Sequence, residues 1–489
     1  MRIPSSYLVQ FQEPTGYLDF ARFGPPSHAV VEEHTRLLER SSFAGPSTVD
    51  ELMRQEPRAK AAAARLCGSD ADHVVLLPNT STGLFQMALG VTGEVAVSPA
   101  EFPANTYPWV RAGRARVRWL DPGPVTPESV REALSEDVTA VSVSAVDFRT
   151  GYRADLAALR EVVGDRLLIV DGIQGFGVVD EPWSAADVLV VGGQKWLRAG
   201  WSTGFLAMSD RALERVEPVA SGWTGAADAG WFDGSVHPVA AGAAAWSVTN
   251  LSPVAAGALA TALELVELAG VRALHERIVR RSDELADVVR SAGGAVVSEQ
   301  VRRAGILAFT LPDVPAAVVG EALAEAGVTA TVRPEHVRLS PHASTSAETV
   351  ERVASALRPL RRAAGGGLPG AVAAGAGVSG GGVSGGGVSG AGLSGDGLSG
   401  SGVPGAVVAG SAVEAFPGDV DTLQRLLVER AVGSVGVPVE LMKKAHKSQV
   451  VRVLDEAGLF LIRDSVDYLA GVLGVTRYTI YNYLNEIRA

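Results

Sequence analysis

A lysine placed directly after a buried strand is the feature that most constrains this chain. Residues 188–191 are four consecutive apolar residues, which predict a buried strand, and Gly192 and Gly193 end it. Lys195 follows two positions later, so its amine is expected at the edge of a sheet. Because burial of a charged ammonium is costly, such a lysine either extends its amine into solvent or uses it chemically.

An acidic residue in the corresponding place on a second strand favours the chemical use. Residues 167–170 are apolar and predict another buried strand, which Asp171 follows. A carboxylate and a lysine at the ends of neighbouring strands suit a ligand with a basic ring nitrogen and an electrophilic carbon. Pyridoxal phosphate has both, so Asp171 and Lys195 predict a site for this cofactor.

Length and composition bound the class of protein. The 489 residues predict two or more domains, because a single core rarely grows to that size. A hydrophobic content of 47% with 20% charged residues is typical of a soluble globular protein, and the net charge of −11 argues against a nucleic-acid coat. The one cysteine, Cys67, excludes a disulfide framework and favours a reducing, cytoplasmic location. No metal site is predicted.

An uncharged stretch raises the question of a membrane span. Residues 236–263 contain no Asp, Glu, Lys or Arg, but they are rich in Ala and Gly. They also include Ser252 followed by Pro253, which is typical of an N-cap and first helical turn. We therefore expect a buried helix from about residue 253 to 269 and no contact with a membrane.

Strands and helices alternate over residues 74–208, which predicts an α/β fold with a mostly parallel sheet and ligands at its strand ends. Within this region, residues 79–82 form a polar turn before a helix. Such a turn is either a plain helix cap or an anion site, because backbone N–H groups and the helix dipole point toward it.

The motifs around Asp171 and Lys195 resemble those of class V aminotransferases, a fold-type I group that includes cysteine desulfurases, kynureninases and isopenicillin N epimerase-like proteins. The resemblance spans about residues 10–360. It implies a large α/β domain, a smaller α+β domain and a pyridoxal-phosphate enzyme acting on an amino acid or amine, as aminotransferase, lyase or hydrolase. Lys195 would hold the cofactor aldehyde as a Schiff base, and Asp171 would keep the ring nitrogen protonated.

The resemblance assigns further residues to the cofactor. Thr80 and Ser81 match the phosphate cup, and Phe102 matches the side chain that stacks on the pyridine face. Gln194 and Gln174 match residues that bond the phosphate and the ring oxygen, respectively. Taken singly, these residues have ordinary alternatives, such as a helix cap for the turn and a core position for the aromatic ring.

Substrate and dimer contacts are implied in the same way. Arg338, in Arg-Leu-Ser-Pro, matches an arginine that grips the substrate carboxylate through its planar guanidinium. Its alternative is a surface arginine on an edge strand. Asn250 matches a substrate-side turn, and Trp223 matches a residue that one subunit of a homodimer lends to the other's phosphate site. Phe148 stands where many members have asparagine, which disfavours a standard cysteine desulfurase.

Glycine-rich repeats separate this region from the end of the chain. From Gly377 the sequence repeats with a period of five, as in Gly-Val-Ser-Gly-Gly, which matches no common solenoid. We expect a flexible linker over residues 363–415, with a root-mean-square span of roughly 35–40 Å. The predicted domains are residues 1–362, divided into a large domain at about 46–250 and a small domain at about 251–362 plus the N-terminal segment, and residues 416–489.

The C-terminal residues predict a helix-turn-helix. Residues 464–487 contain two amphipathic helices with a tight turn at Gly474. This region closely resembles the DNA-binding domain of YheO-type bacterial transcription regulators. The residues expected to face a DNA groove are Arg477, Tyr478, Thr479 and Asn482. Those expected to contact phosphates are Lys443, Lys444 and Lys447.

The charge of this domain leaves its partner open. Residues 418–489 hold nine acidic residues and nine Lys or Arg residues, so attraction to DNA phosphates is modest per copy. The module therefore either binds DNA as part of a dimer or binds protein. For the whole chain, the alternative to a working enzyme is a regulator that senses an amino compound through pyridoxal phosphate and binds DNA.

Overall fold

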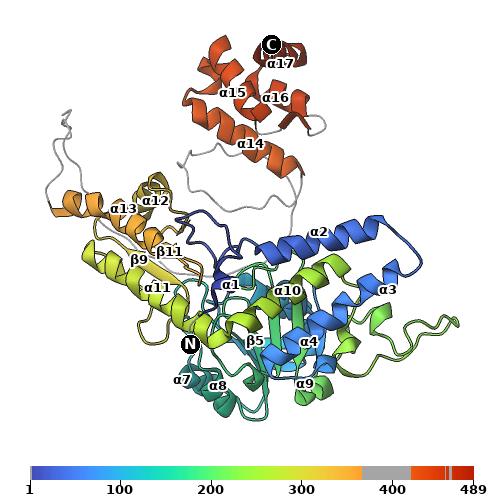
Figure 1. Ribbon diagram of the computed structural model, residues 1–489. Helices are drawn as coiled ribbons and strands as arrows, with labels where there is room; N and C mark the ends of the chain where they lie inside the picture. Colours follow the sequence, from blue (N-terminus) through green and yellow to red (C-terminus); the bar gives the residue numbers. More distant parts are fainter. Residues whose placement is uncertain (1–2, 366–419, 457–458, 462–464, 489) are drawn as a thin grey trace, which may run out of the picture. The chain divides into compact units, whose positions relative to one another are not determined.

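The computed structural model describes residues 3–365, 420–456, 459–461 and 465–488 (Figure 1). These residues fall into two compact units, one on each side of the undescribed stretch 366–419. The predicted linker lies outside the described residues, except for 363–365, which end helix α13 (Ala347–Gly365).

A seven-stranded sheet forms the centre of the first unit. Its strand order is β1-β7-β6-β5-β4-β2-β3. Strand β7 runs antiparallel to both neighbours and the other pairings are parallel, so the predicted mostly parallel sheet is confirmed. The strands are β1 (Val74–Leu76), β2 (Gly93–Val97), β3 (Ala115–Trp119), β4 (Val138–Ser144), β5 (Leu167–Asp171), β6 (Val188–Gly192) and β7 (Gly204–Met208).

Helices cover both faces of this sheet (Figure 1). They are α2 (His28–Ser42), α3 (Thr48–Met53), α4 (Gln55–Cys67), α5 (Thr80–Gly90), α6 (Tyr107–Ala112), α7 (Pro127–Ala133), α8 (Leu156–Val163), α9 (Asp210–Arg215) and α10 (Pro253–Ala269). In β5, Leu168 and Val170 join the core formed with α4, α8 and α10. Leu167 and Ile169 join the core formed with α5 and α6. Alternate side chains thus enter opposite cores, as the period of a strand requires.

The uncharged stretch forms α10, as expected, and Ser252 caps it by accepting a hydrogen bond from the Ala255 amide. Helix α10 packs against α2 and α4, so it belongs to the large-domain core, although the small domain was predicted to begin at about residue 251. Within the described part of the chain, no single helix is long and apolar enough to span a bilayer. Helices α10 and α11 (Val271–Ser291) reach that length and hydropathy only as a pair bent by 81°.

A second sheet of four antiparallel strands forms the small domain. Its order is β10-β11-β9-β8. Helix α11 joins the two domains, because Ile278 packs in the large core and Leu285 in the small one. The remaining elements of the small domain are β8 (Ala295–Val296), β9 (Leu307–Thr310), α12 (Ala316–Glu325), β10 (Thr331–Val332), β11 (Val337–Leu339) and α13.

The N-terminal segment, which we define as residues 9–27 after the short helix α1 (Ser5–Leu8), connects this small sheet to the lysine turn. Its Leu18 amide donates to Thr329 O at 3.0 Å, and the Ser340 amide donates to Leu18 O at 2.7 Å. Farther along, the Gly24 amide donates to Gln194 O at 2.9 Å. One extended segment therefore contacts both domains next to Lys195.

The second unit is helical. Its main elements are α14 (Val420–Val435), α15 (Lys444–Glu456), α16 (Ser465–Leu473) and α17 (Arg477–Arg488). Leu454, Leu469, Ile480 and Leu484 are buried in one shared core. Gly474 has a φ of +60° between α16 and α17, a conformation that suits glycine, so the predicted helix-turn-helix is confirmed.

Candidate active site

Lys195 lies in the turn that follows β6 and is partly buried. Its Nζ lies 5.6 Å from the centre of the Phe102 ring. Burial lowers the pKa of Lys195 from 10.5 to about 8, against the opposing effect of Asp171. A larger fraction of this amine is therefore neutral, and nucleophilic, near pH 7 than for an exposed lysine.

Asp171 ends the neighbouring strand β5 and is 2% exposed. Its Oδ1 accepts a hydrogen bond from the Ile173 amide at 3.0 Å. Burial raises the pKa of Asp171 to about 6, while the Ile173 amide and the charge of Lys195 oppose that rise. The two groups predicted from the strand ends thus lie at one edge of the sheet and interact electrostatically.

Polar groups converge where β6 ends. Asn79 caps α5 by accepting from the Thr82 amide at 2.9 Å, so the helix-cap interpretation holds for Asn79. The Thr80 hydroxyl is buried without a hydrogen-bond partner among the described residues. A Cβ at Gly192 would lie 2.8 Å from that hydroxyl and 2.7 Å from the Gln194 Oε1, so both groups line one small cradle that only glycine leaves open. The Thr80 hydroxyl can donate to a phosphate group, and Gln194 can do so only through its amide nitrogen; Ser81, beside them, is exposed.

Two aromatic rings lie beside the lysine. The Phe102 and Phe148 rings meet edge to face with centres 5.2 Å apart. Phe102 is 42% exposed, so it is not the core aromatic of the alternative interpretation. A half-exposed flat ring next to Lys195 fits the pyridine of the cofactor.

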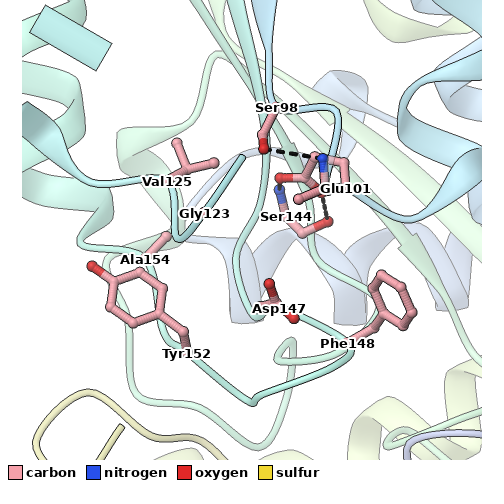
Figure 2. Close-up of a pocket in the computed structure, with 10 residues that line it drawn as sticks. Ser98, Glu101, Gly123, Val125, Ser144, Asp147, Phe148, Tyr152 and Ala154 are labelled. Carbon is pink, nitrogen blue, oxygen red and sulfur yellow. Dashed lines mark hydrogen bonds between the residues drawn. The ribbon is translucent and has the colours of Figure 1, made fainter. Parts of the chain in front are cut away.

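Glu101 is a residue that the sequence analysis missed. Its carboxylate accepts hydrogen bonds from the Ser144 amide, at 2.8 Å, and from the Ser144 hydroxyl (Figure 2). It lines a cavity of about 20 Å³, room for about one water molecule, together with Asp147. Burial raises the pKa of Glu101 to about 7, Ser144 opposes the rise and Asp171 adds to it. Because Glu101 precedes Phe102, its bonds to β4 fix the loop that carries the ring.

Arg338 is buried, which excludes the surface-arginine interpretation. Its guanidinium donates to Phe148 O at 2.7 Å and to the Thr331 hydroxyl at 2.9 Å, and it lies 3.5 Å from Asp19. Its positive charge also contributes to the lowered pKa of Lys195, after burial. The small domain therefore presents an arginine toward the lysine.

Gln174 has protein partners on both polar ends of its side chain. Its amide nitrogen donates to Ala21 O at 3.0 Å, and its Oε1 accepts from the Trp196 indole at 2.8 Å. Only one amide hydrogen is left for a ligand. The structure thus gives Gln174 a role in holding the N-terminal segment that the sequence did not indicate.

Trp223 and Asn250 lie together, but apart from the lysine. They line a cavity of about 290 Å³ with Lys60 and Glu56, and neither Lys195 nor Asp171 belongs to its wall. The Trp223 side chain is 52% exposed. Within one chain, therefore, the structure does not bring these two predicted residues to Lys195.

Cys67, in α4, is buried, and burial raises the pKa of its thiol far above the usual value. It lines a separate cavity with His73 and Trp183. A buried, protonated thiol is a poor nucleophile, which disfavours persulfide chemistry at this residue.

The first turns of α17 present the side chains expected to face DNA. Arg477, Tyr478 and Asn482 are exposed, and Tyr478 is 73% exposed. Thr479 is partly engaged, because its amide and hydroxyl contact the Thr476 hydroxyl at 3.3 and 2.9 Å.

Two of the three lysines expected at phosphates have protein partners. Lys447 Nζ donates to Leu473 O at 2.7 Å at the end of α16, and Lys444 pairs with Glu486 at 2.8 Å. The Lys447 amine is therefore a helix cap rather than a free phosphate contact.

Comparison with known proteins agrees with this geometry. The family model described as aminotransferase class V matches residues 27–353, and a model described as HTH domain matches residues 423–485. Kynureninase from Deinococcus radiodurans is 30% identical over 213 residues, which cover 41% of this chain and 52% of that protein. Isopenicillin N epimerase from Streptomyces clavuligerus is 28% identical over 197 residues, 36% of this chain and 49% of that protein. The chain thus spans about half the length of these relatives.

Solved structures share the fold of the first unit. A cysteine desulfurase from Thermococcus onnurineus superposes with a TM-score of 0.66 at 17% identity, covering 74% of this chain and 99% of that one. A mutant of C-DES with glycine covalently linked to its PLP cofactor gives the same TM-score at 18% identity, covering 73% and 99%. The class V match covers well over half of the chain, and it implies pyridoxal phosphate as the cofactor. A helix-turn-helix domain follows in the C-terminal part of the chain. On the larger match, the chain belongs to the class V aminotransferase family.

Proposed function

We propose that the first unit is a pyridoxal-phosphate enzyme that acts on an amino acid or amine through Lys195, as aminotransferase, lyase or hydrolase. One observation supports this proposal. Lys195, whose pKa is lowered, lies near Asp171 and the Phe102 ring where β5 and β6 end. An ordinary structural lysine has no need of a buried carboxylate and a half-exposed ring beside its amine.

Residues from α5 and from the ends of β2, β5 and β6 would hold the cofactor. Thr80, Ser81 and Gln194 would bind its phosphate, Phe102 would lie against its ring, and the remaining amide hydrogen of Gln174 would reach its ring oxygen. Asp171 would form an ion pair with its protonated ring nitrogen. When bound, the cofactor supplies an electron sink for the electron pair left on the substrate's α-carbon.

The chain's own residues then bind, orient and move protons. The Lys195 amine, freed when substrate takes its place, is the base that removes the α-proton and the acid that returns it. A pKa near 8 suits both roles, because neither form of the amine is scarce near neutral pH.

The reactivity of Lys195 should depend on pH through this shifted pKa. Attachment of pyridoxal phosphate to cofactor-free protein requires the neutral amine. Below about pH 8 the rate should rise roughly tenfold per pH unit, and above it the rate should level off. Stopped-flow absorbance between pH 6.5 and 10 measures this profile. A rate that keeps rising to pH 10 would show that the amine is not buried as described.

Arg338 is the proposed clamp for the substrate carboxylate. Arg338→Gln should raise KM for an amino-acid substrate about 10- to 100-fold, because a charge-assisted bidentate contact is lost. Arg333→Gln, in the turn before β11, is the matched control and should leave KM unchanged within about twofold. An unchanged KM in the Arg338 variant would move the carboxylate site elsewhere.

The reaction is identified by products. Purified protein with added pyridoxal phosphate is offered each common amino acid, and the mixtures are analysed by mass spectrometry. A keto acid, a cleavage fragment or a racemised amino acid that forms only with Lys195 present supports the enzyme proposal. Spectral change without any product would favour the second candidate, a regulator that senses an amino compound.

The helix-turn-helix domain is the observation that favours this second candidate. We infer that the C-terminal unit binds DNA through Arg477, Tyr478, Thr479 and Asn482. The exposure of Arg477, Tyr478 and Asn482 on α17 supports the proposal. We also infer a homodimer in the cytoplasm. The exposed indole of Trp223, away from Lys195 of its own subunit, supports donation to the partner's phosphate site, and Asn250 beside it would approach the same substrate.

A further inference from the structure

Arg198 lies three residues after Lys195 in an unusual conformation. Its φ is +60°, a left-handed value that residues other than glycine rarely adopt. Its amide donates to Lys195 O at 3.1 Å, so the turn that carries the lysine closes on Arg198. The side chain does not point to solvent, because Arg198 is only 2% exposed. Neither the strained backbone nor the buried charge has a place in the mechanism proposed above.

The Arg198 guanidinium joins three parts of the chain. It forms an ion pair with Glu13 at 2.5 Å and donates to Pro25 O at 2.5 Å, both in the N-terminal segment. It also donates to the Ser344 hydroxyl at 3.1 Å, in the small domain. Ser344 in turn donates to the Glu13 carboxylate. We call Arg198, Glu13 and Ser344 the latch.

The surroundings of the latch are apolar. The guanidinium lies 3.9 Å from the centre of the Phe11 ring and 5.1 Å from that of Phe20. His342 is also adjacent, and burial, then the charge of Arg198, keeps its pKa well below the usual value, so the ring is neutral. Removal of either ion from such an enclosed pair leaves the other charge buried, with no water to solvate it. The stability of the latch therefore depends on both partners.

The N-terminal segment held by the latch contacts both sides of the site. A Cβ at Gly24 would lie only 1.9 Å from Lys195 O, so the segment runs directly against the lysine's peptide group. Five residues before Gly24, Asp19 contacts Arg338 at 3.5 Å and the Thr331 hydroxyl at 2.5 Å. The segment therefore spans from the peptide of Lys195 to the guanidinium of Arg338.

We propose that Arg198 is a positioning residue whose buried ion pair with Glu13 fixes the N-terminal segment and so sets the carboxylate clamp, Arg338, relative to the amine of Lys195. The latch gives the site its preference for amines that carry a carboxylate over simple amines. This inference rests on the proposed function, because it takes Lys195 as the cofactor lysine and Arg338 as the clamp.

A pair of reagents tests the alignment without knowledge of the substrate. Aminooxyacetate and methoxyamine both displace Lys195 from the cofactor, because the aminooxy nitrogen forms the bond to the aldehyde carbon and the lysine amine leaves. Only aminooxyacetate carries a carboxylate. The ratio of their second-order rate constants, followed by the cofactor's absorbance in the full-length holoprotein, reports how well the clamp and the lysine are aligned.

The variants separate positioning from mere stability. Glu13→Gln removes the charge and keeps the shape, and Ser344→Ala is a milder change that removes one latch contact. Glu267→Gln is the matched control, because it breaks a similar two-bond arginine pair, with Arg65, on exposed helix surfaces. Arg338→Gln provides the reference for a lost clamp.

In the wild type, aminooxyacetate should react at least about tenfold faster than methoxyamine, and Arg338→Gln should bring the ratio near one. Glu13→Gln should lower the ratio about tenfold while changing the methoxyamine rate less than about threefold. Ser344→Ala should lower it by a smaller factor, and Glu267→Gln should keep the wild-type ratio.

The outcomes that overturn the inference are distinct from those that overturn the proposed function. If Arg338→Gln lowers the ratio and neither Glu13→Gln nor Ser344→Ala does, the latch fails and the clamp stands. If Glu13→Gln does not fold, Ser344→Ala decides alone. An unchanged ratio in Arg338→Gln, or no reaction with either reagent, overturns the clamp or the cofactor lysine, and the latch proposal with it.

Discussion

Replacing Lys195 by alanine is expected to abolish covalent attachment of the cofactor. The labelled lysine is easily identified, because residues 1–365 contain only two lysines, Lys60 and Lys195. Wild-type protein loaded with pyridoxal phosphate and reduced with borohydride should carry a pyridoxyl group on one peptide, the one that contains Lys195. In Lys195→Ala that adduct should disappear, and the visible absorbance of the bound cofactor should shift to that of the free aldehyde.

The effect on turnover should be equally large. Removal of the group that both holds the aldehyde and moves the α-proton should cost at least about 10³-fold in kcat, by analogy with other nucleophile and base deletions. Lys60→Ala is the matched control, since Lys60 lies in the separate cavity with Trp223. A pyridoxyl group found on Lys60, or retained in Lys195→Ala, would contradict the assignment.

The site residues that can be predicted from the sequence are those whose neighbours along the chain determine their position. Asp171 and Lys195 each follow an apolar run, and a parallel sheet brings such strand ends to one edge. The structure places them there, with Phe102 beside the lysine. Their proposed roles in catalysis stay predictions that the experiments above address.

The parts that sequence misses depend on partners far along the chain. Arg198 resembles any arginine in a loop until Glu13 and Ser344, 185 and 146 residues away, surround it. Gln174 is similar, because its amide is engaged by Ala21 and by the Trp196 indole. Glu101 had a local signal, since it is an acid in a turn that follows the apolar residues 95–97 of β2, the pattern that identified Asp171.

The same distinction applies to the fold. The apolar runs of β5 and β6 predict their strands, but β3 (Ala115–Trp119) was not predicted. It is an edge strand with alternating arginines and only partial burial, so its hydrophobic signal is weak. The antiparallel direction of β7 was not expected either, because strand direction depends on the connection between strands rather than on the strand's own residues.

The C-terminal unit carries the second large prediction. Full-length protein should recover specific fragments of its own genome in a DNA pull-down, whereas a protein that ends at residue 365, the end of α13, should recover none. The truncated protein should keep the cofactor absorbance, because its core and the latch lie within residues 3–365. Cofactor binding and DNA binding would then belong to separate parts of one chain.

Point variants in the full chain make this prediction specific to α17. Arg477→Ala and Asn482→Ala should each lower DNA affinity about tenfold, the usual effect of losing a groove contact. Arg452→Ala, an exposed arginine of α15, is the control and should lower affinity less, with a smaller salt slope as its only signature.

The balanced charge of the C-terminal unit determines how binding should respond to dimerisation. With nine acidic and nine basic residues in 418–489, one copy has little general attraction to DNA, so tight binding needs two copies. In the proposed homodimer, the two C-terminal units raise each other's local concentration, because both belong to one particle. Affinity of the full-length protein should therefore exceed that of the isolated residues 416–489 by at least about 100-fold. Equal affinities would contradict the contribution of dimerisation. Absence of binding by the isolated domain, or recovery of DNA by the truncated protein at high salt, would contradict DNA binding by this domain and favour a protein partner.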